Sequence, residues 1–104
     1  MNLTATLAAA TLVAAGAAHA QSAPDLLEKH ACTACHAVDK KGVGPAHNDV
    51  SAKYKGNAKA ADMLADKVKK GGSGVWGAVP MPPNAQVPEA DIKAMVAYVL
   101  ALKK

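Results

Sequence analysis

The sequence predicts an all-α fold of about four helices. Four stretches place apolar residues at helical spacing, and no stretch alternates apolar and polar residues as a half-buried strand does. The longest segment without periodicity, residues 71–87, is rich in Gly and Pro and is therefore expected to be a loop.

The first twenty residues have the composition of a secretory signal peptide. They contain no Lys, Arg, Asp or Glu, and they end in Ala18-His19-Ala20, a small-x-small cleavage pattern. The alternative is a membrane anchor. However, the apolar stretch is shorter than the roughly 20 residues that span a bilayer, and Ala and Thr drive insertion poorly. We therefore expect a cleaved signal peptide over residues 1–20, no membrane anchor, and one exported domain over residues 21–104.

The exported region opens with a pattern typical of a helix start. Ser22 is placed to cap the helix, Pro24 falls in its first turn, and Asp25 lies near the positive end of the helix dipole. This helix is predicted to run as far as Cys32.

Three more helices are expected along the chain. A short one covers about 48–55, and the next runs over about 58–70 and stops at Gly71-Gly72. The last is opened by Pro88 and closed by the two terminal lysines. Its apolar face repeats at i, i+3, i+4, i+7 and i+8, with Ile92, Met95, Val96, Val99 and Leu100.

The charge pattern disfavours nucleic acid as a partner. The net charge is +4 and every one of the 12 basic residues is Lys, so no Arg is available for bidentate contacts with bases or phosphates. A basic surface that attracts acidic protein partners is the better interpretation.

The composition leaves the domain short of large apolar side chains. The chain has no Phe, one Trp and two Tyr, and a domain of this size buries only a marginal core. The long loop over residues 71–87 is also unusual in so small a domain unless it has a function. A bound tetrapyrrole accounts for both features, because it supplies apolar area and gives the loop something to wrap.

Cys32-Thr33-Ala34-Cys35-His36 fits the C-x-x-C-H pattern of covalent haem attachment. Two thiols three residues apart project from the same side of a helical turn, so each can add to one vinyl group of the porphyrin. The histidine that follows then points toward the ring centre and its iron. We therefore predict one haem c, held by Cys32 and Cys35, with His36 as an axial ligand.

The two cysteines allow three other interpretations. A thioredoxin-type dithiol expects a strand before the motif and a sheet around it, which this chain does not offer. A zinc site has His30 and His47 available but no second pair at metal spacing. A structural disulfide between Cys32 and Cys35 closes too small a loop to stabilise the fold much.

Met81 is the predicted second axial ligand. It stands in Val79-Pro80-Met81-Pro82-Pro83-Asn84, where three prolines exclude a helix and stiffen the loop that carries the thioether. Met63 and Met95 lie in predicted helices and are assigned to packing or to the surface. His47 remains an alternative that would give bis-histidine iron, and His30 is expected to be a solvated helix residue.

Over residues 25–104 the chain resembles the short bacterial class I cytochromes c, of the cytochrome c-551 or c8 type. The resemblance rests on several motifs in the right order: CTACH, Val43-Gly44-Pro45-Ala46 with Asp49-Val50 and Lys53-Tyr54, Gly74-Val75-Trp76-Gly77, and the proline-rich segment around Met81. It implies a class I cytochrome c fold, with about four helices wrapped around one covalently bound haem.

The resemblance also implies roles for residues around the haem. Pro45 is expected to accept the Nδ1 hydrogen of His36, Trp76 to donate to a haem propionate, and Asn84 to lie beside the methionine sulfur. Lys67 stands where relatives often carry an arginine near a propionate, so that contact should be weaker. The chain also departs from the pattern at His47, where relatives usually have an aromatic residue, and at Leu27, where many have Phe.

The function implied is one-electron transfer in the periplasm by a monomer that is not an enzyme. Expected partners are respiratory or denitrification redox proteins, soluble or membrane-bound: a haem-containing nitrite reductase, a terminal oxidase, a peroxidase or a bc1-type donor. Two rivals stay open at this stage. One is an enzyme or gas-binding haem protein in which Met81 is off the iron, and the other is a dithiol oxidoreductase without haem.

Overall fold

The computed structural model describes residues 8–9 and 21–103. The predicted signal peptide, residues 1–20, lies outside the described residues apart from Ala8 and Ala9. Within the described part, no helix is both long and apolar enough to cross a bilayer.

Four α-helices and one 3-10 turn make up the described domain, and no β-strand accompanies them there. In chain order they are α1 (Ala23–Lys29), the 3-10 turn η1 (Cys32–Ala34), α2 (His47–Lys53), α3 (Ala60–Lys70) and α4 (Glu89–Ala101). The predicted all-α class is confirmed. The helices predicted over 48–55 and 58–70 are present as α2 and α3, with ends that differ by one or two residues.

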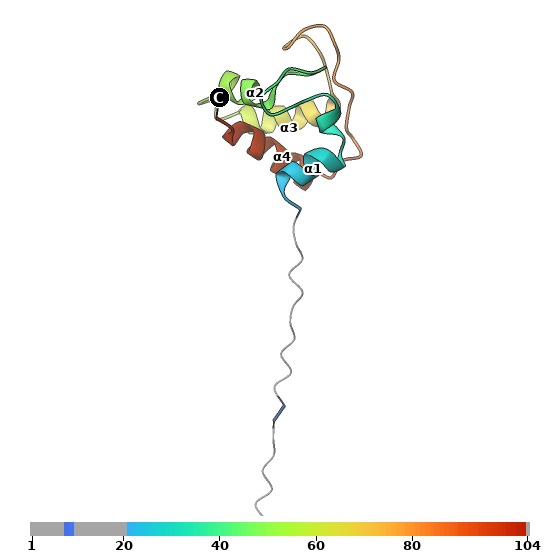
Figure 1. The fold of residues 1–104 in the computed structure, drawn as a ribbon, viewed down its shortest axis with the longest axis vertical. Coiled ribbons are helices and arrows are strands. Elements are labelled where there is room, and N and C mark those ends of the chain that lie inside the picture. The colour runs from blue at the N-terminus through green and yellow to red at the C-terminus, as the bar shows by residue number, and fades with distance from the viewer. Residues whose placement is uncertain (1–7, 10–20, 104) are drawn as a thin grey trace, which may run out of the picture.

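The C-terminal helix organises the fold because α4 contacts α1, α2 and α3. Figure 1 shows α4 (red) lying against α1 (blue) and α3 (yellow), while the loop between α3 and α4 (orange) projects away from the helices. The helices thus form one packed body, and the two longest irregular segments are residues 35–46 and 71–88.

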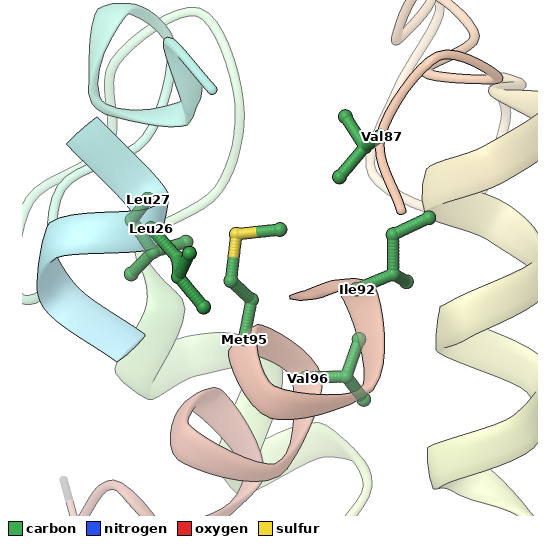
Figure 2. Close-up of a cluster of buried hydrophobic side chains, with 6 residues drawn as sticks. All are labelled: Leu26, Leu27, Val87, Ile92, Met95 and Val96. Atoms are coloured by element: carbon green, nitrogen blue, oxygen red, sulfur yellow. The ribbon is translucent and has the colours of Figure 1, made fainter. Parts of the chain in front are cut away.

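The core gathers around one face of α4. Ile92 is 1% exposed and Met95 3% exposed. Figure 2 shows Met95 between Val87 and the pair Leu26 and Leu27 of α1, while Ile92 lies on the side of α3. Each such side chain stabilises the fold by roughly 1.5–3 kcal/mol when it leaves water. The remaining members of this buried cluster are Val87 and Val96.

The first helix begins as predicted and ends earlier. The Ser22 hydroxyl accepts a hydrogen bond from the Asp25 backbone N–H (3.3 Å), which caps the helix. The prediction that the helix runs into Cys32 is wrong, because α1 ends at Lys29. Ala31 then adopts a left-handed conformation with φ of 60°, which turns the chain before η1 begins. The cysteine motif therefore occupies its own turn rather than the end of a helix.

Candidate functional site

The motif Cys32–His36 is built on the 3-10 turn η1. The backbone N–H groups of Cys35 and His36 both donate to the Cys32 carbonyl, at 3.2 and 3.0 Å. The two cysteines form no disulfide with each other and are partly buried, and Cys32 packs against the hydrophobic core. Burial raises the pKa of the Cys32 thiol, and Cys35 adds to the effect. The turn thus presents two thiols and the imidazole from one short stretch of backbone.

A hydrogen bond to a backbone carbonyl fixes which nitrogen of His36 is available. Nδ1 of His36 lies 2.7 Å from the carbonyl oxygen of Pro45. Because a carbonyl oxygen can only accept, Nδ1 carries the hydrogen and Nε2 of the neutral ring carries the lone pair. This is the arrangement of a metal-binding histidine whose other nitrogen is held by the protein. The contact expected of Pro45 is present in the structure.

Gly44 allows the chain to come close to the His36 ring. Its backbone N–H donates to the Cys35 carbonyl (2.8 Å). A Cβ at this position would meet the ring Nδ1 at 2.8 Å and Nε2 at 2.9 Å, and it would come closer still to Cε1. Only glycine fits there, so the residue before Pro45 is tied to the position of the imidazole.

The imidazole of His47 stacks on that of His36. The ring centroids are 4.9 Å apart and the planes make an angle of 21°. His47 is only 7% exposed, and burial together with the nearby His36 lowers its pKa to about 4. Ligands on opposite faces of a haem point their nitrogens at each other across the iron, which two rings stacked face to face cannot do. The geometry therefore argues against His47 as the second axial ligand.

Met81 is held at the base of the loop between α3 and α4. It forms an antiparallel pair with Gly72, in which the Met81 N–H donates to the Gly72 carbonyl (2.8 Å) and the Gly72 N–H donates back (3.1 Å). Gly71 has φ of 72°, and a Cβ on it would collide with the backbone of residues 81–83. The loop is thus closed by backbone contacts on both sides of Met81, which is itself partly buried.

Asn84 fastens the far end of this loop to α3. Its side-chain Nδ2 donates to the carbonyls of Val68 (3.2 Å) and Pro82 (3.1 Å). Its backbone N–H also donates to the carbonyls of Val68 and Lys69. The residue therefore satisfies carbonyls at the end of the helix while bracing the segment after Met81. The expected contact with the methionine sulfur stays a prediction.

Trp76 lies in the loop between α3 and α4, and Lys67 of α3 reaches the start of that loop at Gly72. Trp76 is 42% exposed, the Lys53 ammonium lies 5.6 Å from its ring centroid, and the indole borders a cavity of about 150 Å³ beside Pro45 and Ala46. Lys67 extends over Gly72, since a Cβ there would lie 2.8 Å from its Nζ. Their expected contacts with haem propionates stay predictions.

Three contacts were missed at the sequence level: the His36–His47 stack, the Lys53–Trp76 contact, and a bond between His30 and Asp91. His30 is not the solvated residue expected, because its side chain is 14% exposed and its Nε2 lies 3.0 Å from Asp91 Oδ2. Asp91 lies 61 positions from His30 in the sequence, and no local sequence pattern predicts that pairing. The resemblance marked His47 as a departure from the family pattern, but it did not predict that the ring stacks on His36.

The donor set fits a covalently attached haem. Two cysteine side chains that form no disulfide adjoin an imidazole whose Nε2 lone pair is available, and a thioether is braced on a separate loop. The described residues contain no cluster of three or more His, Cys, Asp or Glu side chains able to hold a metal ion, so the zinc alternative gains no support. Fold and site together define a small all-α protein of the c-type haem class.

Comparison with known proteins places the chain within that class. The family model described as Cytochrome c matches residues 13–103, and the chain belongs to the cytochrome c family. It is 51% identical over 98 residues to cytochrome c-552 of Nitrosomonas europaea, covering 94% of this chain and 93% of that one. It is 58% identical over 77 residues to cytochrome c-551 of Allochromatium vinosum, covering 74% and 82% of the two chains.

Solved structures agree with this assignment. The crystal structure of wild-type cytochrome c552 from Nitrosomonas europaea superposes with a TM-score of 0.75 at 52% identity, covering 77% of this chain and 99% of that one. The predicted class I cytochrome c fold is confirmed. As a family member the chain binds one covalently attached haem c with its iron, and it is an electron-transfer protein rather than an enzyme.

Proposed function

We propose that this chain is a periplasmic one-electron carrier, with haem attached at Cys32 and Cys35 and with iron ligated by His36 and Met81. The observation that carries the proposal is the hydrogen bond between His36 Nδ1 and the Pro45 carbonyl. It leaves Nε2 free to bind iron and makes the imidazole a stronger donor. When bound, the haem supplies the reversible one-electron couple of its iron.

Met81 completes the proposed ligand pair. A thioether together with a histidine fills both axial positions, which suits electron transfer and leaves no open position for a substrate. The Gly72–Met81 pair and the prolines around it hold the loop in shape before the metal binds. Little ordering entropy is then lost on ligation, and the thioether raises the reduction potential.

The lysine-rich surface next to the motif fits transient docking of acidic redox partners. Lys40 and Lys41 lie four and five residues after His36, and Lys53 and Lys55 lie at and just beyond the end of α2; all four are exposed. Such charges increase the rate of encounter with an acidic partner, and they do so less at high salt. By resemblance we propose as partners a haem-containing nitrite reductase, a terminal oxidase, a peroxidase or a bc1-type donor, which the monomeric carrier contacts through a small interface.

The N-terminal sequence supports export. Residues 1–20 carry no charged side chain and end in a small-x-small pattern, so we propose cleavage after Ala20 and a periplasmic domain over residues 21–104. The mass of the protein purified from the periplasm tests both points. A mature chain from Gln21 plus one haem is expected, and a protein that retains residues 1–20 in the membrane fraction would contradict them.

Absorption spectroscopy of protein made with haem-maturation machinery tests the ligation. We expect a low-spin c-type spectrum, a weak far-red band from sulfur bound to ferric iron, and no carbon monoxide binding by the reduced protein at neutral pH. A colourless product with two free thiols would overturn the haem assignment for this chain. Ready binding of carbon monoxide would overturn the His/Met ligation and favour a gas-binding haem protein.

A further inference from the structure

We propose that His47 is a positioning residue for the axial imidazole, and that its stacked ring fixes the plane of His36 relative to the haem. The inference rests on the proposed ligation by His36 and adds a residue to it. It concerns a position for which the resemblance implies an aromatic residue and at which this chain carries a histidine.

The two rings are held in register by the backbone as well as by their stacking. His47 is the first residue of α2, and its N–H donates to the Ala37 carbonyl at 2.8 Å. The next N–H, of Asn48, donates to the Val38 carbonyl at 2.9 Å. The free N–H groups at the start of α2 therefore bind the two residues that directly follow His36. Any shift of His47 would have to break these bonds.

The hydrogen bond to Pro45 does not by itself fix the ring plane. It anchors one edge of the His36 ring, with Nδ1 2.7 Å from a single oxygen, but a hydrogen bond tolerates a range of angles, so limited rotation of the ring plane is still allowed. A flat neighbour at 4.9 Å and 21° opposes that rotation, because turning His36 would drive its edge into the His47 ring. His47 is 7% exposed and cannot swing into solvent to make room.

The plane of an axial imidazole matters to the metal. The π system of the ring overlaps with one of the two iron dπ orbitals more than with the other, according to its angle about the iron–nitrogen bond. That angle sets the energy difference between the two orbitals, and hence the electron-paramagnetic-resonance g values of the ferric state. A ring free to rotate would give a distribution of angles and therefore broadened g values. The midpoint potential would shift as well, because it depends on the energies of the same orbitals.

The test compares holoproteins that keep or lose the stacked ring. His47→Phe retains a flat neighbour, His47→Leu removes it, and Tyr98→Leu removes a partly buried ring elsewhere in the core as a control for plain packing loss. We expect His47→Leu to displace and broaden the largest g value of the ferric protein and to shift the midpoint potential. His47→Phe should restore both toward the wild type, and Tyr98→Leu should lower only the melting temperature.

Each outcome decides the question. Wild-type g values and potential in His47→Leu would overturn the inference, as would equal changes in His47→Phe and His47→Leu. If His47→Leu does not accumulate with haem, His47→Gln, which keeps a polar side chain without a ring, takes its place under the same criteria. Failure of the ligation itself is seen separately, because wild-type protein would then lack the low-spin signal and the far-red band before any variant is compared.

Discussion

His30 and Asp91 join the end of α1 to the start of α4. His30 Nε2 lies 3.0 Å from Asp91 Oδ2, and the two side chains are only 14% and 26% exposed. His30 follows the last residue of α1 and stands two positions before Cys32, whereas Asp91 lies in the first turn of α4. The contact therefore couples the segment just before the thiols to α4, the helix that carries the buried residues Ile92, Met95, Val96 and Val99.

Removing this contact should destabilise the domain measurably. We expect Asp91→Asn or His30→Ala to lower the free energy of unfolding by about 1 kcal/mol, because the pair is partly shielded from water and bridges two helices. Urea denaturation of the holoprotein measures the change. Lys93→Ala is the matched control, since Lys93 lies 3.8 Å from Glu89 in an exposed pair on a single helix and should change the free energy by less than about 0.5 kcal/mol. Equal effects at both sites would contradict the assignment.

Replacement of Met81 should change the iron and leave the haem attached. Met81→Ala is expected to abolish the far-red band, lower the reduction potential and admit carbon monoxide to the reduced protein, because the thioether is lost while Cys32 and Cys35 remain. Met63→Ala, at an exposed position on α3 (42% exposed), should alter none of these. The far-red absorption spectrum and the reduction potential are measured for both variants. An unchanged reduction potential in Met81→Ala would contradict the assignment of Met81 as a ligand.

Gly44→Ala should disturb the proximal histidine directly. The new methyl group would lie less than 3 Å from both ring nitrogens of His36, so either the ring or the backbone must move. We expect reduced yield of holoprotein and a perturbed low-spin spectrum. Gly56→Ala is the control: its φ of 77° strains an alanine, but its Cβ meets nothing within 4 Å. That variant should lose about 1 kcal/mol of stability with a normal spectrum.

Sequence reasoning recovered the features that depend on local pattern. The helix cap at Ser22, the stop at Gly71 and the apolar face around Ile92 and Met95 follow from spacing and capping chemistry, and the structure contains them. It missed the left-handed residue Ala31, because nothing in its neighbours marks a non-glycine residue with positive φ.

Contacts between distant segments were less accessible from the sequence. The His36–Pro45 bond was expected only because a resemblance supplied it. The His36–His47 and His30–Asp91 contacts depend on how α2 and α4 pack against the N-terminal segment, which is tertiary information. Residue type predicts which side chains can bind a metal or form a hydrogen bond. Tertiary packing determines which of those side chains are in contact.

The buried His47 gives stability a defined dependence on pH. Burial is the larger cause of its lowered pKa of about 4, and the adjacent His36 lowers it further. As the pH falls through the ordinary histidine value of 6.5, the unfolded chain takes up a proton at His47 while the folded protein does not until about pH 4. Stability is therefore lost as the pH falls over this window, by about 2 kcal/mol between pH 7 and pH 5.

Comparison with His47→Phe isolates this contribution from that of the carboxylates. Urea midpoints of both proteins are measured at pH 7 and at pH 5, and the wild-type midpoint should fall further than that of His47→Phe, since only the wild type loses the histidine contribution. Parallel loss of stability in the two proteins would show that His47 takes up its proton equally in the folded and unfolded states.

Asn84 should control how firmly Met81 is held. Its amide donates to the carbonyls of Val68 and Pro82, so Asn84→Ala leaves both acceptors without this partner and loosens the segment after Met81. We expect the far-red band to disappear at a lower urea concentration than helical circular dichroism does, because the loop opens before the helices unfold. In the wild type the two transitions should lie closer together.

The neighbouring residue Gln86, which is exposed, provides the control for this prediction. Gln86→Ala changes the same loop without removing the amide that bridges α3 to Pro82, so its two transitions should keep the wild-type separation. A second variant, Asn84→Asp, keeps the size of the side chain but replaces the donating amide with an acceptor facing two carbonyls. It should loosen Met81 at least as much as alanine does, because a carboxylate cannot donate to either oxygen. If the far-red band of Asn84→Asp persists to the same urea concentration as in the wild type, Met81 is held by the prolines and the Gly72 pair instead.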